Sequence, residues 1–190
     1  MKRHSFLKFA AAVAAIITSP FAGQSSPRNT KRLSKGFKVE KGKDRFDASI
    51  TLLEGDTFYT KISSKDTDGD SFLFESTRVV KGGPPLHYHP NQDEWFYILE
   101  GEFNFKVGEE SFTAKPGDSL FAPRTVPHAF TKTNEGIARM MILFQPAGMM
   151  EMHFKAVSEG LYKGMTADEK RNVQKEHGTV VVGPALGHEK

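Results

Sequence analysis

Two histidines and one carboxylate lie close together near the middle of the chain. His87 and His89 are two positions apart, and Glu94 follows five residues after the second histidine. In a β-strand, side chains at positions i and i+2 project from the same face, so the two imidazoles are expected to lie side by side. Imidazole nitrogens next to a carboxylate suit a borderline divalent transition metal. The spacing therefore predicts a metal site in the stretch 82–101.

A third histidine, His128, opens a later predicted strand and strengthens this prediction. A single histidine on an apolar strand is more often a core residue than a ligand. Burying three imidazoles and a carboxylate together without a partner would be costly, however, and a bound metal ion removes that cost. The expected cofactor is one divalent transition metal. These ligands accept Fe, Mn, Ni, Cu or Zn, so the residues alone do not select among them.

The composition excludes several other classes of function. There is no cysteine, which rules out thiol catalysis, a zinc finger and a disulfide framework. The formal net charge is +3 at pH 7, from 26 Lys and Arg against 23 Asp and Glu. Three of the cations, Lys2, Arg3 and Lys8, belong to a leader segment. The rest of the chain is about neutral, which gives no case for binding nucleic acid.

The leader, residues 1–24, has the layout of a secretory signal peptide. A basic start is followed by an apolar run at 9–18 and by small residues around 22–26. The apolar run is too short to cross a bilayer. We therefore expect export to the periplasm or out of the cell, with no membrane span once the leader is removed. The polar, basic segment 25–45 is expected to form a linker or a loosely attached arm.

Short strands dominate the segment 46–148. Runs of β-branched and aromatic residues alternate there with turns rich in Gly, Pro and Asp, at close and regular spacing. This pattern favours an all-β fold, either a sandwich or a jelly-roll barrel.

Helices are expected only in the C-terminal extension, residues 149–190. In the stretch 149–162, apolar residues recur at helical spacing, at Met150, Phe154, Val157 and Leu161. Thr166 and Glu169 form a capping box, which predicts the start of a second helix before a closing edge strand at 179–182.

Two segments of the predicted barrel resemble the paired motifs of the cupin superfamily. They read Gly82-x4-His87-x-His89-x4-Glu94-x6-Gly101 and Gly117-x5-Pro123-x-Thr125-x2-His128, with threonine at 125 where a glycine is usual. The resemblance covers residues 50–148 and extends to short single-domain cupins similar to bacterial quercetin 2,3-dioxygenases. It implies a cupin jelly-roll β-barrel with one or two C-terminal helices. It also implies that the divalent metal is bound by His87, His89, Glu94 and His128.

The narrower resemblance implies a metal-dependent dioxygenase acting on a small phenolic or enolic compound. Glu94 is expected to serve both as a metal ligand and as the catalytic base that removes a proton from a substrate hydroxyl. By strand parity, Phe96 and Ile98 face the same interior as Glu94, and Phe130 faces the same interior as His128, which predicts an aromatic substrate pocket. Two other classes stay open: a small-molecule-binding protein without turnover, and a cupin isomerase or lyase.

The remaining histidines and the outer face of the barrel have less specific interpretations. His153 and His177 fall on the predicted helices and are interpreted as surface residues. The face that carries Trp95, Tyr97 and Leu99 points away from the predicted site. We expect it to pack beneath another layer or against a second subunit, in a homodimer. Three arginines, at 78, 124 and 139, are candidates for binding an anionic substrate, but no spacing selects one of them.

Overall fold

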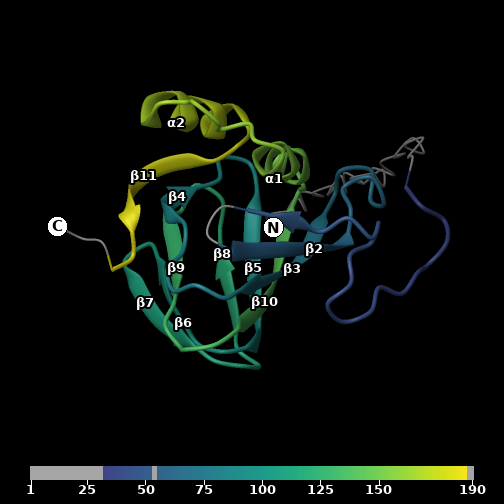
Figure 1. The fold of residues 1–190 in the computed structure, drawn as a ribbon, viewed down its shortest axis with the longest axis horizontal. Helices are drawn as coiled ribbons and strands as arrows, with labels where there is room; N and C mark the ends of the chain where they lie inside the picture. The colour runs from purple at the N-terminus through teal and green to yellow at the C-terminus, as the bar shows by residue number, and fades with distance from the viewer. Residues whose placement is uncertain (1–31, 53–54, 188–190) are drawn as a thin grey trace, which may run out of the picture.

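The barrel is built from two antiparallel β-sheets that face each other across a shared interior (Figure 1). The computed structural model describes residues 32–52 and 55–187. The first sheet has the strand order β1-β2-β3-β10-β5-β8. Its strands are β1 (Ile50–Thr51), β2 (Asp56–Ile62), β3 (Phe72–Arg78), β10 (Ala138–Gln145), β5 (Asp93–Glu100) and β8 (Ser119–Ala122).

The second sheet has the strand order β11-β4-β9-β6-β7. Its strands are β11 (Val180–Ala185), β4 (Pro85–Tyr88), β9 (His128–Lys132), β6 (Phe103–Val107) and β7 (Glu110–Ala114). Together the sheets form the predicted all-β jelly roll. In the stretch 82–101, β4 and β5 follow each other in the chain but belong to opposite sheets. The two halves of that stretch therefore face each other across the barrel.

Alternation along the long strands places one set of side chains in the interior. On β5, Phe96 and Ile98 are buried, whereas Tyr97 on the opposite face is 36% exposed. On β3 and β10 the same alternation buries Phe72, Phe74 and Phe144, whose rings pack against one another. The inward orientation expected from strand parity is therefore observed. A homodimer contact through the outward face that carries Tyr97 stays a prediction.

The C-terminal extension covers one end of the barrel. Helices α1 (Met150–Ser158) and α2 (Ala167–Glu176) lie across that end in Figure 1, and β11 then runs down beside β4. The predicted capping box is present: Thr166 accepts a hydrogen bond from the backbone N–H of Glu169, whose side chain binds the backbone N–H of Thr166. No side chain of α2 is fully buried. The position of this helix therefore depends largely on its capped N-terminus and on β11.

The described part of the N-terminal arm is fastened to the barrel. The buried carboxylate of Asp44 accepts hydrogen bonds from the backbone N–H groups of Phe46 and Thr60, at 2.7 and 2.6 Å. The predicted signal peptide, residues 1–24, lies outside the described residues, so its removal and the export of the chain stay predictions. In the part of the chain that the structure describes, no helix has the length and apolar character needed to span a membrane.

Candidate metal centre

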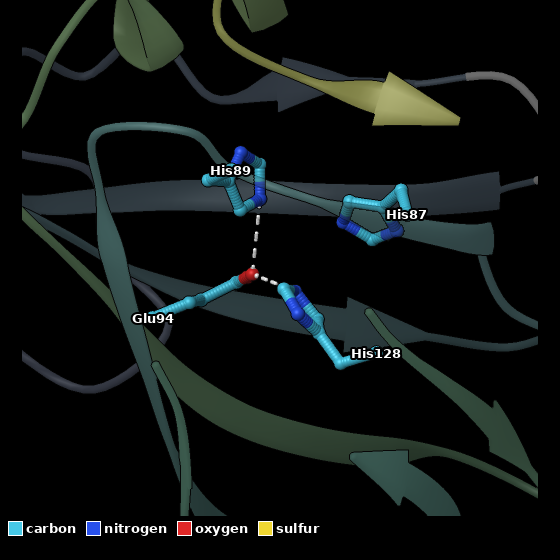
Figure 2. Close-up of side chains that lie close together, drawn as sticks. All are labelled: His87, His89, Glu94 and His128. Atoms are coloured by element: carbon cyan, nitrogen blue, oxygen red, sulfur yellow. Dashed lines mark hydrogen bonds and ion pairs between the residues drawn. The ribbon is translucent and has the colours of Figure 1, made fainter. Parts of the chain in front are cut away.

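The four predicted ligands gather in one buried cluster between the two sheets. His87 on β4 is paired directly with His128 on β9, and His89 follows immediately after β4. Glu94 projects toward them from β5 in the opposite sheet (Figure 2). One potential ligand atom from each residue lies within 4.8 Å of all the others. It is the only such group of three or more metal-binding side chains in residues 32–52 and 55–187.

Each imidazole of the cluster is oriented by a backbone carbonyl. The Nδ1 atoms of His87, His89 and His128 lie 2.7, 2.8 and 3.0 Å from the carbonyl oxygens of residues 85, 178 and 126. Because a carbonyl can only accept a hydrogen bond, each Nδ1 must carry the proton. The three Nε2 atoms are then left for the interior of the cluster. A hydrogen bond from the distal ring nitrogen to a carbonyl is the usual support of a metal-binding histidine.

The Glu94 carboxylate sits among the Nε2 atoms. Its Oε2 lies 2.8 Å from His128 Nε2 and 3.2 Å from His89 Nε2. Burial alone would raise the pKa of the Glu94 carboxyl, but its close contacts with the imidazoles of His128 and His89 outweigh burial and hold that pKa far below its ordinary value. Burial would likewise lower the pKa of His128, yet the Glu94 carboxylate raises it. The cluster thus places the buried carboxylate of Glu94 beside imidazole nitrogens that can bind a proton.

A divalent cation fits this donor set better than a proton does. Nε2 of His89 is buried and makes no hydrogen bond of acceptable geometry with any described residue, although it lies within ion-pair distance of Glu94. Burial, with the neighbouring His128 and His89, also lowers the pKa of His87 to about 3, so this imidazole is neutral and presents a lone pair. Three imidazoles that direct Nε2 inward and one carboxylate suit a borderline transition metal. The cluster can therefore hold one metal ion.

Backbone geometry beside the cluster supports His89. The backbone N–H of Thr125 donates a hydrogen bond of 2.8 Å to the carbonyl of His89. Thr125 has φ 67°, in the left-handed region that a β-branched residue rarely adopts. This conformation explains why glycine is usual at this position of the second motif.

A cavity of about 310 Å³ opens onto the cluster between the barrel and the C-terminal extension. His87, His89 and Glu94 form part of its wall. Aromatic rings supply much of the remainder, from Phe58, Phe74, Phe130, Phe144 and Phe154. A small, mostly apolar cavity with a few convergent polar groups is typical of a site for a small organic molecule.

The predicted pocket residues divide into two groups. Phe130 lines the cavity, and its contact with a substrate stays a prediction. Phe96 and Ile98 face the interior but do not line the cavity, and this corrects the prediction. Strand parity predicts which face of the sheet a side chain occupies, but not how far along the barrel it lies. The interior of the barrel below the cluster is filled with side chains. Phe96 packs there between His128 and Phe105, with ring centroids 6.3 and 5.0 Å away.

The three candidate arginines are also separated by the structure. Arg78 lines the cavity and is buried, with Nη1 3.5 Å from Oδ2 of Asp56. Arg124 lies at the surface in an ion pair with Asp93, and Arg139 binds Glu75 on the outer face of the first sheet.

His153 is the residue that the sequence interpretation placed wrongly. It was expected at the surface, but it is 5% exposed and lines the cavity. His177 is half-buried, with its ring centroid 4.7 Å from that of His153. A signal was present in the sequence: His153 is three residues after Met150 and four before Val157, on the apolar face of the predicted helix.

Residues 75–144, which include all four residues of the cluster, match the family described as a cupin domain. This segment is a cupin domain. Among curated relatives, the chain is 27% identical to quercetin 2,3-dioxygenase from Bacillus subtilis over 156 residues, which is 79% of this chain and 44% of the relative. It is 30% identical to the polyketide synthase CurC from Streptomyces cyaneus, over 47% of this chain and 57% of that protein. The chain thus spans about half the length of these relatives.

The solved structures that match this chain have lower sequence identities. KdgF from Halomonas sp. aligns with 57% of this chain and 94% of its own, at 17% identity and a TM-score of 0.48. A predicted oxalate decarboxylase from Thermotoga maritima aligns with 52% of this chain and 90% of its own, at 18% identity and a TM-score of 0.47.

Proposed function

We propose that this cupin is a metal-dependent dioxygenase of the quercetinase type, acting on a small phenolic or enolic compound. The observation that carries the proposal is the aromatic cavity that opens directly onto the cluster of His87, His89 and Glu94. The name of the Bacillus subtilis relative, quercetin 2,3-dioxygenase, supports the same class of reaction.

The cluster would hold the metal through His87, His89, Glu94 and His128. A redox-active ion bound there supplies Lewis acidity toward a substrate oxygen and an electron path to O₂. The three histidines need no rearrangement for this role, because their carbonyl partners already direct each Nε2 into the cluster. The protein therefore contributes a preformed set of ligands.

Glu94 is the side chain placed to accept the proton of a substrate hydroxyl. Only two carboxylates border the cavity among the described residues, Glu94 and Asp56. Asp56 is already engaged by the hydroxyl of Ser76 at 2.9 Å and by Arg78. Glu94 is the carboxylate beside the imidazoles, so a hydroxyl directed at the cluster meets it first. General-base catalysis requires this kind of proximity before it requires a matched pKa.

The aromatic wall would bind the body of the substrate and exclude water. The rings of Phe58, Phe74 and Phe154 pack against one another, with centroids 4.3 to 5.6 Å apart. A planar ring system can stack on or meet the edges of such rings. Exclusion of water strengthens the electrostatic interaction between a substrate oxygen and the charged cluster.

Oxygen uptake tests this proposal. The purified protein is stripped with a chelator, reloaded separately with Fe(II), Mn(II), Ni(II), Cu(II) or Zn(II), and mixed with quercetin. We expect at least one redox-active form to consume one O₂ per flavonol, while the stripped protein is inactive. Glu94→Gln is expected to lose activity, and the exposed Glu110→Gln is the matched control.

Two outcomes would replace the proposal. Conversion of substrate without O₂ would favour an isomerase or lyase. Tight binding of quercetin without turnover in any metal form would favour a binding protein.

A further inference from the structure

His153 brings a buried polar side chain to the helical wall of the cavity. It lies on α1, which crosses the end of the barrel (Figure 1), and it borders the cavity that also reaches the metal cluster. Its neighbours on the same face of α1 are the apolar residues Met150, Phe154 and Val157, which line the cavity too. A histidine at such a position is costly unless its ring nitrogens have partners.

The Tyr162 hydroxyl is the hydrogen-bond partner of this ring at Nε2. The Tyr162 hydroxyl lies 2.9 Å from Nε2 of His153. Burial raises the pKa of the Tyr162 phenol to about 12, so the hydroxyl keeps its proton and can donate it to Nε2. Burial and the neighbouring His177 lower the pKa of His153 to about 4, so the imidazole is neutral near pH 7. A neutral ring that accepts at Nε2 must carry its own proton on Nδ1.

The Nδ1 atom of His153 has no partner of its own. It is buried, and it makes no hydrogen bond to any described residue. A fixed ring therefore holds an unpaired N–H donor in the wall of a cavity that is otherwise mostly apolar. A buried ring nitrogen of this kind in a cavity wall is suited to a hydrogen bond with an oxygen of a bound molecule.

We propose that His153 is a substrate-contacting residue that determines specificity, with Nδ1–H donating a hydrogen bond to a substrate oxygen remote from the metal cluster. Tyr162 is the positioning residue that sets the tautomer. This inference rests on the proposed function and deepens it. The substrate is then two-ended: one phenolic or enolic oxygen approaches Glu94 and the imidazoles, an aromatic body lies among the phenylalanines, and a second oxygen meets His153.

The test measures binding, so that it does not depend on turnover. The protein is loaded with Zn(II), which has no redox chemistry, and is titrated with two flavonols. 3-Hydroxyflavone carries only the hydroxyl–carbonyl pair suited to a metal, whereas quercetin carries the same pair and further hydroxyls on its other rings. The wild-type protein is expected to bind quercetin about tenfold or more tightly than 3-hydroxyflavone.

Variants of His153 then locate the selectivity. His153→Phe keeps a flat ring without the N–H and is expected to lose about tenfold in quercetin affinity, with 3-hydroxyflavone changed by less than about twofold. His153→Gln restores an N–H donor and is expected to recover part of that loss. Tyr162→Phe should give a smaller loss of the same kind. Met152→Leu, on the exposed side of α1, should match the wild-type protein. Zinc content and thermal melting confirm that each variant is folded and loaded.

Two results would overturn the inference. One is a His153→Phe variant that weakens both flavonols equally or neither. The other is a wild-type protein that does not distinguish the two flavonols, including one that binds neither. The proposed function is judged separately, because oxygen uptake can succeed while this selectivity is absent, and the selectivity can be present in a protein that consumes no O₂.

Discussion

The backbone carbonyl of Gly178 accepts a hydrogen bond from Nδ1 of His89 across 2.8 Å, although the two residues are 89 positions apart. His89 belongs to the barrel, and Gly178 lies between α2 and β11 in the C-terminal extension. The extension therefore does more than cover the cavity: it supplies the hydrogen bond that directs Nε2 of His89 into the cluster. Metal binding and the docking of the extension are expected to be coupled.

Substitution of Gly178 tests this coupling. Gly178 has φ +92°, and a Cβ there would lie 3.1 Å from Oε1 of Gln92. Gly178→Ala is expected to lower the free energy of unfolding by about 1–2 kcal/mol, because the left-handed backbone disfavours a side chain. It is also expected to weaken metal binding about tenfold, as loss of an outer hydrogen bond does. Chelator competition measures the affinity and urea unfolding the stability.

Gly164→Ala is the matched control for that experiment. Gly164 also has a positive φ, +77°, but a Cβ there meets nothing within 4 Å. It carries the same backbone penalty without contact with the site, so it should lose stability and keep its metal affinity. Equal metal affinities in the two variants would contradict the coupling.

A second glycine brings two strands of the site together. A Cβ on Gly83, just before β4, would lie 1.7 Å from the carbonyl oxygen of Phe130 on β9. Gly83→Ala is therefore expected to push β4 away from β9 and to cost at least about 2 kcal/mol of unfolding free energy. At Gly36 a Cβ meets nothing within 4 Å, so Gly36→Ala should change stability by less than about 0.5 kcal/mol. Similar melting temperatures for the two variants would disprove the close approach.

Glu75 is the centre of an ion-pair network on the outer face of the first sheet. Arg139 Nε donates to Glu75 Oε1 at 2.9 Å, and Lys61 Nζ lies 3.2 Å from Oε2. Burial alone would raise the pKa of the Glu75 carboxyl, but the hydrogen bonds of Arg139 and Lys61 outweigh it and leave that pKa below the ordinary value. A lowered folded-state pKa means that this stabilisation is complete above the unfolded value, near pH 4.5, and is lost as the pH falls further.

Glu75→Gln should therefore lower the free energy of unfolding by about 2 kcal/mol at pH 7. The difference from the wild-type protein should shrink below about pH 4.5, where the wild type loses the same charge. Urea titrations between pH 3 and pH 7 measure this, with the exposed Glu110→Gln as control. A difference that stays constant over this range would show that the charge of Glu75 contributes nothing.

The four residues of the cluster could be predicted because local rules determine most of their placement. The spacing of His87 and His89 gives a shared face, and the pattern around Glu94 and His128 indicates a buried strand in each case. The prediction that all four residues form one site required the resemblance to the cupin motifs. Their strands are distant in the sequence and meet only in the folded barrel.

Other features depend on tertiary structure that no local pattern specifies. Strand parity predicted that Phe96 and Ile98 face inward. Their position along the barrel places them in the packed core and not in the cavity wall. The contact of His89 with Gly178 joins two ends of the fold, and nothing in either segment indicates it. His153 was misplaced because helical histidines are more often exposed, although its position on the apolar face of α1 was readable.

Metal content is the measurement that tests the central claim most directly. The protein is purified without added metal and analysed by mass spectrometry of the elements, together with His128→Ala and the control Glu110→Gln, which is exposed and lies outside the cluster. We predict about one divalent transition-metal ion per chain in the wild-type protein and in Glu110→Gln, and only a small fraction of that in His128→Ala. A His128→Ala variant that retains as much metal as the wild-type protein would contradict the claim that this cluster is the metal site.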